Sequence, residues 1–358
     1  MPTVPIAVES GRQTEALEAA LEILAPAGAE YAGGFANHGP MAAEALVALA
    51  RPEAVVPWVE RYRRGLSQDP PGSGPIRPGQ WREALGDYGR LSDWTAFFER
   101  GLEEEPWEKV LSKWSGRLAP GIVAAAFHGV IRAAHAARAL SRRTTPSRRK
   151  ELARGLAYWA ARYQTLPETK GSPSRSPRPP SEVIAEVTPL PASRHASGSI
   201  SDRLAPLGNS PAFAAVADLA DVAMGAASFL SDLTRAFARI YLQHSTPVTR
   251  IALIHAVTGP SAVRLLLPHL DPPAAAPLLR YAWQGAAAIY AASAQDRPDS
   301  SERPRPEGLE ELIERAVATR DEHGFKFVEA CLREHAVSPD PIFLAAALDA
   351  TARLPGES

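Results

Sequence analysis

The chain has 358 residues, a formal net charge of −1 and a single cysteine, and 45% of its residues are hydrophobic. This is the composition of a globular protein with a sizeable core, and the near-neutral charge argues against nucleic acid or an anionic membrane surface as a partner. One cysteine excludes an intrachain disulfide framework, and no secretory leader or long apolar run stands out, so we expect a cytoplasmic protein without a membrane span.

Helical periodicity dominates the chain. Apolar residues recur at helical spacing, alanine-rich helix formers are abundant, and strand-like alternation is nearly absent. The sequence therefore predicts an all-α fold for residues 1–358, either one large helical domain or two packed helical halves. The predicted helices cover residues 13–25, 41–50, 53–65, 121–140, 211–242, 247–267, 274–293, 308–336 and 341–353.

Proline-rich loops separate these helices. The chain has 34 prolines, and they cluster. The clusters are predicted as loops, because proline lacks a backbone donor and fixes its own φ. The longest such segment, the proline- and serine-rich stretch 164–208, predicts either a linker between two helical halves or a lid over a pocket, since a loop of that length is uncommon unless functional or disordered. Basic residues are spread out except for a run at 141–154.

Histidine is the main candidate for chemistry. The chain lacks a dinucleotide fingerprint, a phosphate-binding loop, a serine nucleophile elbow and a thiolate zinc set. Its nine histidines include five that lie in apolar helical contexts or at a helix start. A single buried histidine is usually a satisfied core residue, whereas five favour a shared purpose, and neutral imidazole is a common ligand for iron, zinc, copper and nickel. The five are His38, His128, His135, His255 and His323; the other four, His195, His244, His269 and His335, are predicted at loop or surface positions.

Spacing indicates which of these side chains can cooperate. His128 and His135 share a helix face but lie about 10 Å apart along the axis, so both reach one metal only if they lean together. His323 and Lys326 are three residues apart and adjacent on one face. Phe325 and Phe327 flank Lys326, which favours burial of the amine and easier loss of its proton; the alternative is a stem that extends along the surface to water.

Aromatic and basic residues near the histidines are further candidates. A flat apolar pocket for a fused-ring substrate is one interpretation of the aromatic residues, and ordinary core packing is the other. Arg132 and Arg138 can pair with a phenolate or carboxylate of a substrate, but surface salt bridges explain them equally well. The aromatic candidates are Phe35, Phe127, Tyr281 and Trp283.

Four motifs in order carry a resemblance. The segments "NHGPMAAEAL", "AAFHGVIRAAHAARA", "IHAVTGPSAVRLLLPHL" and "DEHGFKFVEACLREH" span residues 37–335 and resemble the questin oxidase-like family. The resemblance implies an α-helical oxidoreductase that oxidises aromatic polyketides, opening anthraquinone-type rings in Baeyer-Villiger fashion or by dioxygen-dependent cleavage. It further implies a site similar to that of non-haem iron oxygenases in which several histidines and a CO₂-modified lysine hold the metal.

The resemblance also implies a ligand set. Five histidines exceed the four that such a site implies, so one of the pair His128 and His135 is expected to lie outside the ligands. The implied metal candidates are His38, His128, His135, His255, His323 and, as a carbamate, Lys326; of these, His38, His135, His255 and Lys326 are also the expected catalytic residues.

The implied cofactors and partners follow from that set. We expect Fe(II), with Mn or Zn as alternatives, O₂ as co-substrate, a CO₂-derived carbamate on Lys326 and a small aromatic molecule as substrate. A requirement for NADPH and the oligomeric state stay open. Two other classes also stay open: a metal-dependent hydrolase or lyase acting on a polyketide, in which zinc or manganese activates water, and a metal-free helical binding protein.

Overall fold

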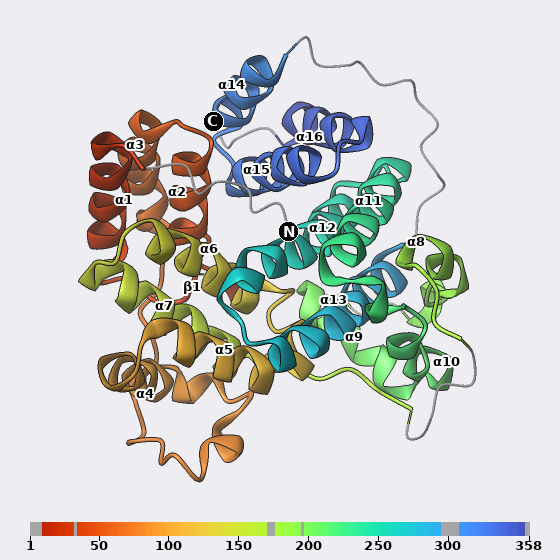
Figure 1. Cartoon of the computed structure of the whole chain (residues 1–358), viewed down its shortest axis with the longest axis horizontal. Helices are drawn as coiled ribbons and strands as arrows, with labels where there is room; N and C mark the ends of the chain where they lie inside the picture. The colour runs from red at the N-terminus through yellow and green to blue at the C-terminus, as the bar shows by residue number, and fades with distance from the viewer. Residues whose placement is uncertain (1–8, 32–33, 170–175, 195–196, 295–307, 355–358) are drawn as a thin grey trace.

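The structure confirms the predicted all-α fold. A computed structural model describes residues 9–31, 34–169, 176–194, 197–294 and 308–354 of the protein. These residues form sixteen α-helices and one two-stranded antiparallel sheet (Figure 1). The first half contains α1 (Gly11–Leu24), β1 (Glu30–Tyr31), β2 (Phe35–Ala36), α2 (Gly39–Ala48), α3 (Pro52–Tyr62), α4 (Leu91–Glu104), α5 (Trp107–Leu118), α6 (His128–Arg142) and α7 (Pro146–Ala161).

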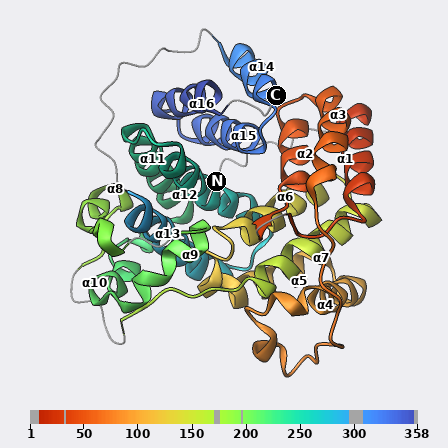
Figure 2. The ribbon, with the colours of Figure 1, turned by 180° about the vertical axis from the view of Figure 1, so that it is seen from behind.

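The second half contains the longest helices. Both views place the short helices α8, α9 and α10 on the side away from α1, α2 and α3 (Figures 1 and 2). The elements are α8 (Pro180–Val183), α9 (Ile200–Leu204), α10 (Pro211–Ala214), α11 (Ala226–Gln243), α12 (Pro247–Leu266), α13 (Pro272–Ser293), α14 (Leu309–Thr319), α15 (Glu322–Val337) and α16 (Pro341–Arg353).

Three predicted helices are interrupted. The predicted helix 121–140 begins only at His128, because Ala125, Ala126 and Phe127 have positive φ angles of 46°, 56° and 69°. The predicted helix 211–242 is broken at Gly225, whose φ of 93° suits a residue without a Cβ. The predicted helix 308–336 is broken at Arg320, and after the cap residue Asp321 a new helix starts at Glu322. Two of these breaks fix where a histidine enters the interior.

Five helices were not predicted: α4, α5, α7 and the short α8 and α9. The basic run at 141–154 contains the start of α7. Thr145 caps that helix by accepting a hydrogen bond from the backbone of Arg148. The Arg148 side chain is fully buried and paired with Glu9 and Glu18 of the N-terminal region. The charge run is therefore partly internal.

A continuous core joins the two halves. The main apolar cluster extends from Ala29 to Ala350 and draws residues from nearly every helix, and α12 lies at its centre against α6, α11, α13 and α15 (Figure 1). A smaller cluster holds α1, α2 and α3 together and includes Phe325 of α15. Since the predicted halves share one core, the fold is a single helical domain.

The described parts of 164–208 pack against this core. The backbone N–H of Leu190 donates to the carbonyl of Ala291 on α13 (2.8 Å), and Arg178 donates to Leu219 (3.0 Å). Leu204 and Leu207 are also buried. This segment therefore lies along α11 and α13 and does not bridge two separate cores; its role as a lid stays a prediction.

The central helix has a membrane-like composition. By length and composition alone, Pro247–His269 is the one stretch among the described helices that could cross a membrane. In the fold, 72% of its most apolar window is buried inside the protein. A helix surrounded by other helices must be apolar on most sides, so its position in the core accounts for this composition.

Candidate metal centre

Four histidines from four separate segments meet in the interior. His38 precedes α2, His128 opens α6, His255 lies within α12 and His323 lies in the first turn of α15. Their rings form a closed circuit of contacts, with centroid distances of 4.4 Å for His38–His128, 4.6 Å for His128–His255, 5.4 Å for His255–His323 and 4.7 Å for His323–His38. The fold thus brings together four of the five predicted histidines.

The hydrogen bonds of two rings define their tautomers. Nδ1 of His128 lies 2.5 Å from the carbonyl oxygen of Ala125, and Nδ1 of His255 lies 2.6 Å from that of Ile251. A carbonyl only accepts, so each Nδ1 carries the proton and donates it. Each Nε2 then presents a lone pair, and the two Nε2 atoms face each other at 3.1 Å.

This pair of nitrogens fits a metal ion. Two facing lone pairs repel unless a cation lies between or beside them. A bridging proton is disfavoured, because burial, followed by repulsion from neighbouring charges, holds the pKa of His128 and of His255 well below the ordinary value. Two ligand nitrogens at about 2.1 Å from a metal and at right angles to each other lie about 3.0 Å apart. The donor chemistry and the spacing therefore match a metal with imidazole ligands.

His38 offers a further unsatisfied nitrogen. Its ring is buried, and Nδ1 lies 3.2 Å from Oε1 of Glu322, within ion-pair range but without hydrogen-bond geometry. The backbone N–H of His38 donates to the hydroxyl oxygen of Tyr62 (2.8 Å), which fixes the chain where α2 begins. Burial, and then the charge of Lys326, hold the pKa of the His38 ring well below its usual range. The ring is therefore kept neutral, the form that binds metals.

Two carboxylates border the cluster at the start of α15. Asp321 caps the helix, accepting from the backbone N–H of His323 (2.7 Å) and lying 3.2 Å from its Nδ1. Hydrogen-bonded carboxylates of this kind orient metal-binding histidines. Glu322 completes a group with His38 and His323 in which one potential ligand atom from each lies within 4.8 Å of the others. Sequence reasoning missed Glu322, although it directly precedes a candidate histidine.

Lys326 lies beside this cluster with its side chain only 3% exposed. Burial lowers the pKa of its amine to about 8, despite the opposing charges of Glu322 and Asp321. Its own charge in turn lowers the pKa of three of the clustered histidines. Because the residue is buried, the alternative of a stem that extends along the surface to water does not hold. Within the described part of the chain the amine makes no hydrogen bond or ion pair.

The two phenylalanines that flank Lys326 pack against aromatic side chains of other helices. Phe325 packs edge-on against Trp58 (5.4 Å), and Phe327 packs against Tyr241 (4.9 Å). They therefore anchor α15 on both sides of the lysine.

His135 lies outside the circuit of rings. Its Nδ1 contacts Oε2 of Glu44 at 2.7 Å, and Glu44 is also bound by Arg138. Arg138 pairs in turn with Glu329. The helix thus directs His128 and His135 to different neighbours, and among the contacts of the described residues His135 has none with the other four candidate histidines.

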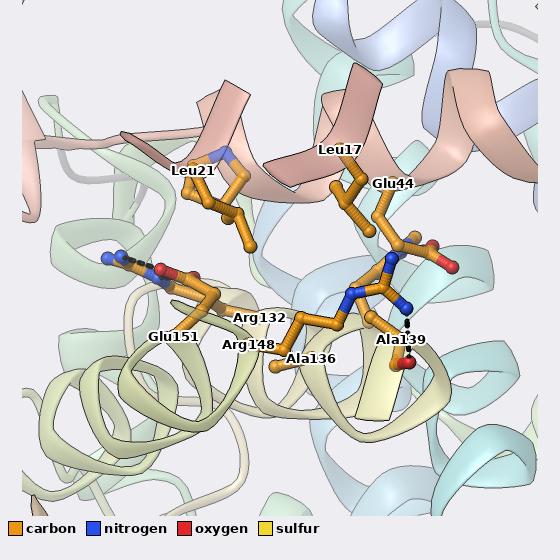
Figure 3. A pocket seen from close by; sticks show the side chains of 10 residues that line it. Leu17, Leu21, Glu44, Arg132, Ala136, Ala139, Arg148 and Glu151 are labelled. Carbon is orange, nitrogen blue, oxygen red and sulfur yellow. Dashed lines mark hydrogen bonds and ion pairs between the residues drawn. The ribbon is translucent and has the colours of Figure 1, made fainter. Parts of the chain in front are cut away.

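A small hollow next to His135 is lined by charged side chains. Figure 3 shows Leu17 and Leu21 of α1 facing Arg132, Arg148 and Glu151, with Glu44 at one end. The hollow measures about 10 Å³, space for roughly one water molecule. It is too small to hold an aromatic substrate.

Both arginine candidates are engaged in buried pairs. Arg132 donates to Glu151 through Nε (2.6 Å) and Nη2 (2.9 Å). Arg138 bridges Glu44 and Glu329, whose carboxyl pKa values are held low by this arginine against the effect of burial. Neither arginine forms the surface bridge that was one reading of the sequence, and neither is free to bind a phenolate.

Replacing Arg138 by leucine is expected to destabilise the protein by about 3–5 kcal/mol, because it removes a buried cation shared by two buried carboxylates. Among the described residues, Glu44 then keeps only His135 and Arg142 as partners, and Glu329 keeps only Arg333. The matched control is Arg51→Leu, which removes a pair with the largely exposed Glu310 and should cost about 0–1 kcal/mol. Urea unfolding measures both. Equal losses in the two variants would show that the Arg138 network contributes no more than a surface pair.

The aromatic candidates do not gather in one pocket. Phe127 and Trp283 are fully buried, and the indole N–H of Trp283 donates to the carbonyl of Val216 (2.6 Å). Phe35 is 50% exposed and stacks on Tyr31, while Tyr281 lies beneath the guanidinium of Arg280. Core packing therefore accounts for Phe127 and Trp283.

The remaining histidines also depart in part from expectation. His244 lies in the loop that follows α11, one of the two positions predicted for it, but it is buried there and its ring contacts Tyr290. His269 packs on Trp107, and His335 lies 2.9 Å from the carbonyl oxygen of Asp340. His195 lies outside the described residues.

Comparison with known proteins adds one finding. Residues 35–331 match the family described as Questin oxidase-like, a span that covers more than half of the chain and includes all four clustered histidines and Lys326. No curated protein matches the chain.

Proposed function

Because the chain belongs to the questin oxidase-like family, which points to an oxidoreductase acting on aromatic polyketides, we propose that it is a non-haem iron oxygenase. The proposed substrate is a small fused-ring polyketide such as an anthraquinone, oxidised with ring opening in a Baeyer-Villiger-like outcome. The proposed co-substrate is O₂ and the proposed location is the cytoplasm. Mn and Zn are the alternative metals.

One observation supports the metal most directly. The Nδ1 atoms of His128 and His255 are committed to backbone carbonyls, so their Nε2 lone pairs face each other at 3.1 Å in a buried site. In the absence of a cation this arrangement is unfavourable, and burial prevents a proton from replacing it. The ring of His38 contacts that of His128, and the ring of His323 contacts that of His255. These two imidazoles would extend the set of nitrogen donors.

The chain's own residues define what such a centre would do. His38, His128, His255 and His323 would hold the metal through neutral imidazole nitrogens. Iron, when bound with an open position, supplies electrons to O₂. Asp321 orients His323, and the fold packed around α12 excludes bulk water from the nitrogens.

Lys326 would supply the anionic ligand after reaction with CO₂. A neutral amine attacks the carbon of CO₂, a C–N bond forms, and one proton leaves to water as the carbamate is made. Burial lowers the pKa of Lys326 to about 8, so a useful fraction of the amine is neutral near physiological pH. The carbamate oxygen would then act as a carboxylate does.

Metal and oxygen measurements test this proposal together. Protein purified without oxygen should contain about one iron per chain by elemental analysis. With a fused aromatic substrate, it should consume O₂ and transfer label from ¹⁸O₂ into the product. Turnover under strict anaerobiosis would instead identify a metal-dependent hydrolase or lyase, and a metal-free protein with no loss of thermal stability on chelation would identify a binding protein.

The pair His128 and His135 gives a sharper prediction within this site. His128→Ala should abolish stoichiometric metal binding, because it removes a nitrogen from the circuit of rings. His135→Ala should retain metal while lowering stability, because that ring contacts Glu44 instead. Metal content and a urea unfolding curve for each variant measure the difference. Equal loss of metal in both would show that His135 turns into the centre when metal binds.

A further inference from the structure

The backbone immediately before His128 has an unusual conformation. Ala125, Ala126 and Phe127 all have positive φ, at 46°, 56° and 69°. In this region the Cβ of an L-residue crowds the following carbonyl oxygen, so such residues normally occur singly and are mostly glycine. Three in succession, none of them glycine, need a compensating interaction elsewhere in the fold.

This left-handed turn sets the direction of the His128 ring. The carbonyl oxygen of Ala125 accepts from the backbone N–H of His128 (3.2 Å) and from its ring Nδ1–H (2.5 Å). One carbonyl thus holds both the main chain and the side chain of the same residue. A right-handed helix through 121–128 would leave that carbonyl in the helical ladder and would aim the ring elsewhere.

The ring of Phe127 locks the turn onto two neighbouring helices. A Cβ built on Gly259 of α12 would lie 2.4 Å from the base of this ring, and one built on Gly285 of α13 would lie 2.5 Å from its tip. The ring therefore occupies a seat that exists only because both positions are glycine. Gly259 is four residues after His255, so the seat lies one helical turn along α12 from the histidine that His128 faces.

We propose that the left-handed turn Ala125–Phe127, locked by the Phe127 ring in the seat of Gly259 and Gly285, is the device that positions His128 for metal binding. Phe127 is thus a positioning residue. The link to metal rests on the proposed function, whereas the locked turn itself does not.

The first test compares two phenylalanines. Phe127 and Phe98 are both fully buried in the main core, but Phe98 packs among Trp94, Phe97 and Trp114 of α4 and α5. Phe127→Leu should weaken binding of Co²⁺ to the metal-free protein by about 10-fold or more and change the visible absorption of the bound ion. Phe98→Leu should lower the melting temperature while leaving Co²⁺ affinity and spectrum unchanged. Equal Co²⁺ affinities for the wild type and Phe127→Leu would overturn the proposal.

A second test needs no metal. Glycine at Ala125 and Ala126 relieves the crowding, so the double variant should melt about 2–4 °C higher than the wild type. The control Ala133→Gly, at a buried right-handed position within α6, should melt lower. A lower melting temperature in the double variant would contradict the turn.

A measurement of the His128 tautomer distinguishes the proposed metal function from the positioning role of Phe127. In the metal-free wild type, nitrogen NMR should show the proton on Nδ1, and Phe127→Leu should give a mixture of tautomers. If the wild type binds no Co²⁺ but this change occurs, the metal function is wrong and the positioning role stands. An unchanged tautomer in Phe127→Leu would refute the positioning role.

Discussion

His255→Ala is expected to cost more than about 100-fold in metal affinity and to abolish oxygen consumption. Loss of a partner that merely orients a metal ligand typically costs about 10- to 100-fold, and loss of a ligand nitrogen should cost more. His255 is chosen because its Nε2 faces that of His128 at 3.1 Å and because it belongs to α12, the helix at the centre of the core. Elemental analysis and an oxygen electrode measure the two losses.

The matched control is His335→Ala. His335 lies on α15, the helix that carries His323, but its ring contacts the carbonyl of Asp340 and no clustered histidine among the described residues. This variant should keep its metal and its activity. A chelator should also lower the melting temperature of the control, since bound metal stabilises the folded state, but not that of His255→Ala. Full metal occupancy in His255→Ala would remove this residue from the ligand set.

Much of the centre was predictable because its residues carry local signals. His38 stands shortly before a proline, which marks a helix start. His323 was identified from its neighbours, whereas the start of its helix at Glu322 was hidden inside the predicted helix 308–336. His255 stood out as a polar residue in an otherwise apolar helix. What the sequence could not show is how the four meet, since they lie on segments far apart in the chain.

The position of His135 outside the circuit of rings depends on a tertiary contact. Seven residues separate it from His128, which places both on one face of a helix, so spacing alone left either of them as the residue outside the ligand set. The deciding partner, Glu44, comes from α2 and takes the His135 ring into an ion-pair network. Periodicity carries no information about which distant helix supplies a partner.

The same network connects the helices that carry the centre. Glu44 belongs to α2, which follows His38; Arg138 belongs to α6, which starts at His128; and Glu329 belongs to α15, which carries Lys326. Arg138 therefore ties together the three helices that carry or follow these proposed ligands. The left-handed turn before His128 was likewise hidden, because alanine is the strongest helix former and a run containing it predicts a continuous helix.

The largest effect at a single non-histidine residue is expected at Lys326. Lys326→Ala should remove the anionic ligand and most of the activity, and Lys326→Arg should not restore it, because a guanidinium cannot form the carbamate. Formate or acetate should restore part of the activity in the alanine variant, since a small carboxylate can enter the vacated space. Oxygen uptake with and without added carboxylate measures this, and the arginine variant serves as the control for which no rescue is expected.

The pH dependence of carbamate formation predicts how metal affinity should change with pH when bicarbonate is present. The neutral amine reacts with CO₂ and releases a proton, so the carbamate is disfavoured below the pKa of about 8 and gains as pH rises through it. Metal-free wild-type protein incubated with bicarbonate should therefore bind metal more tightly at pH 9 than at pH 7, whereas Lys326→Ala should show no bicarbonate effect at either pH. Wild-type activity in Lys326→Ala would contradict the ligand role, and Glu322, 3.2 Å from His38, would then be the carboxylate to replace by glutamine.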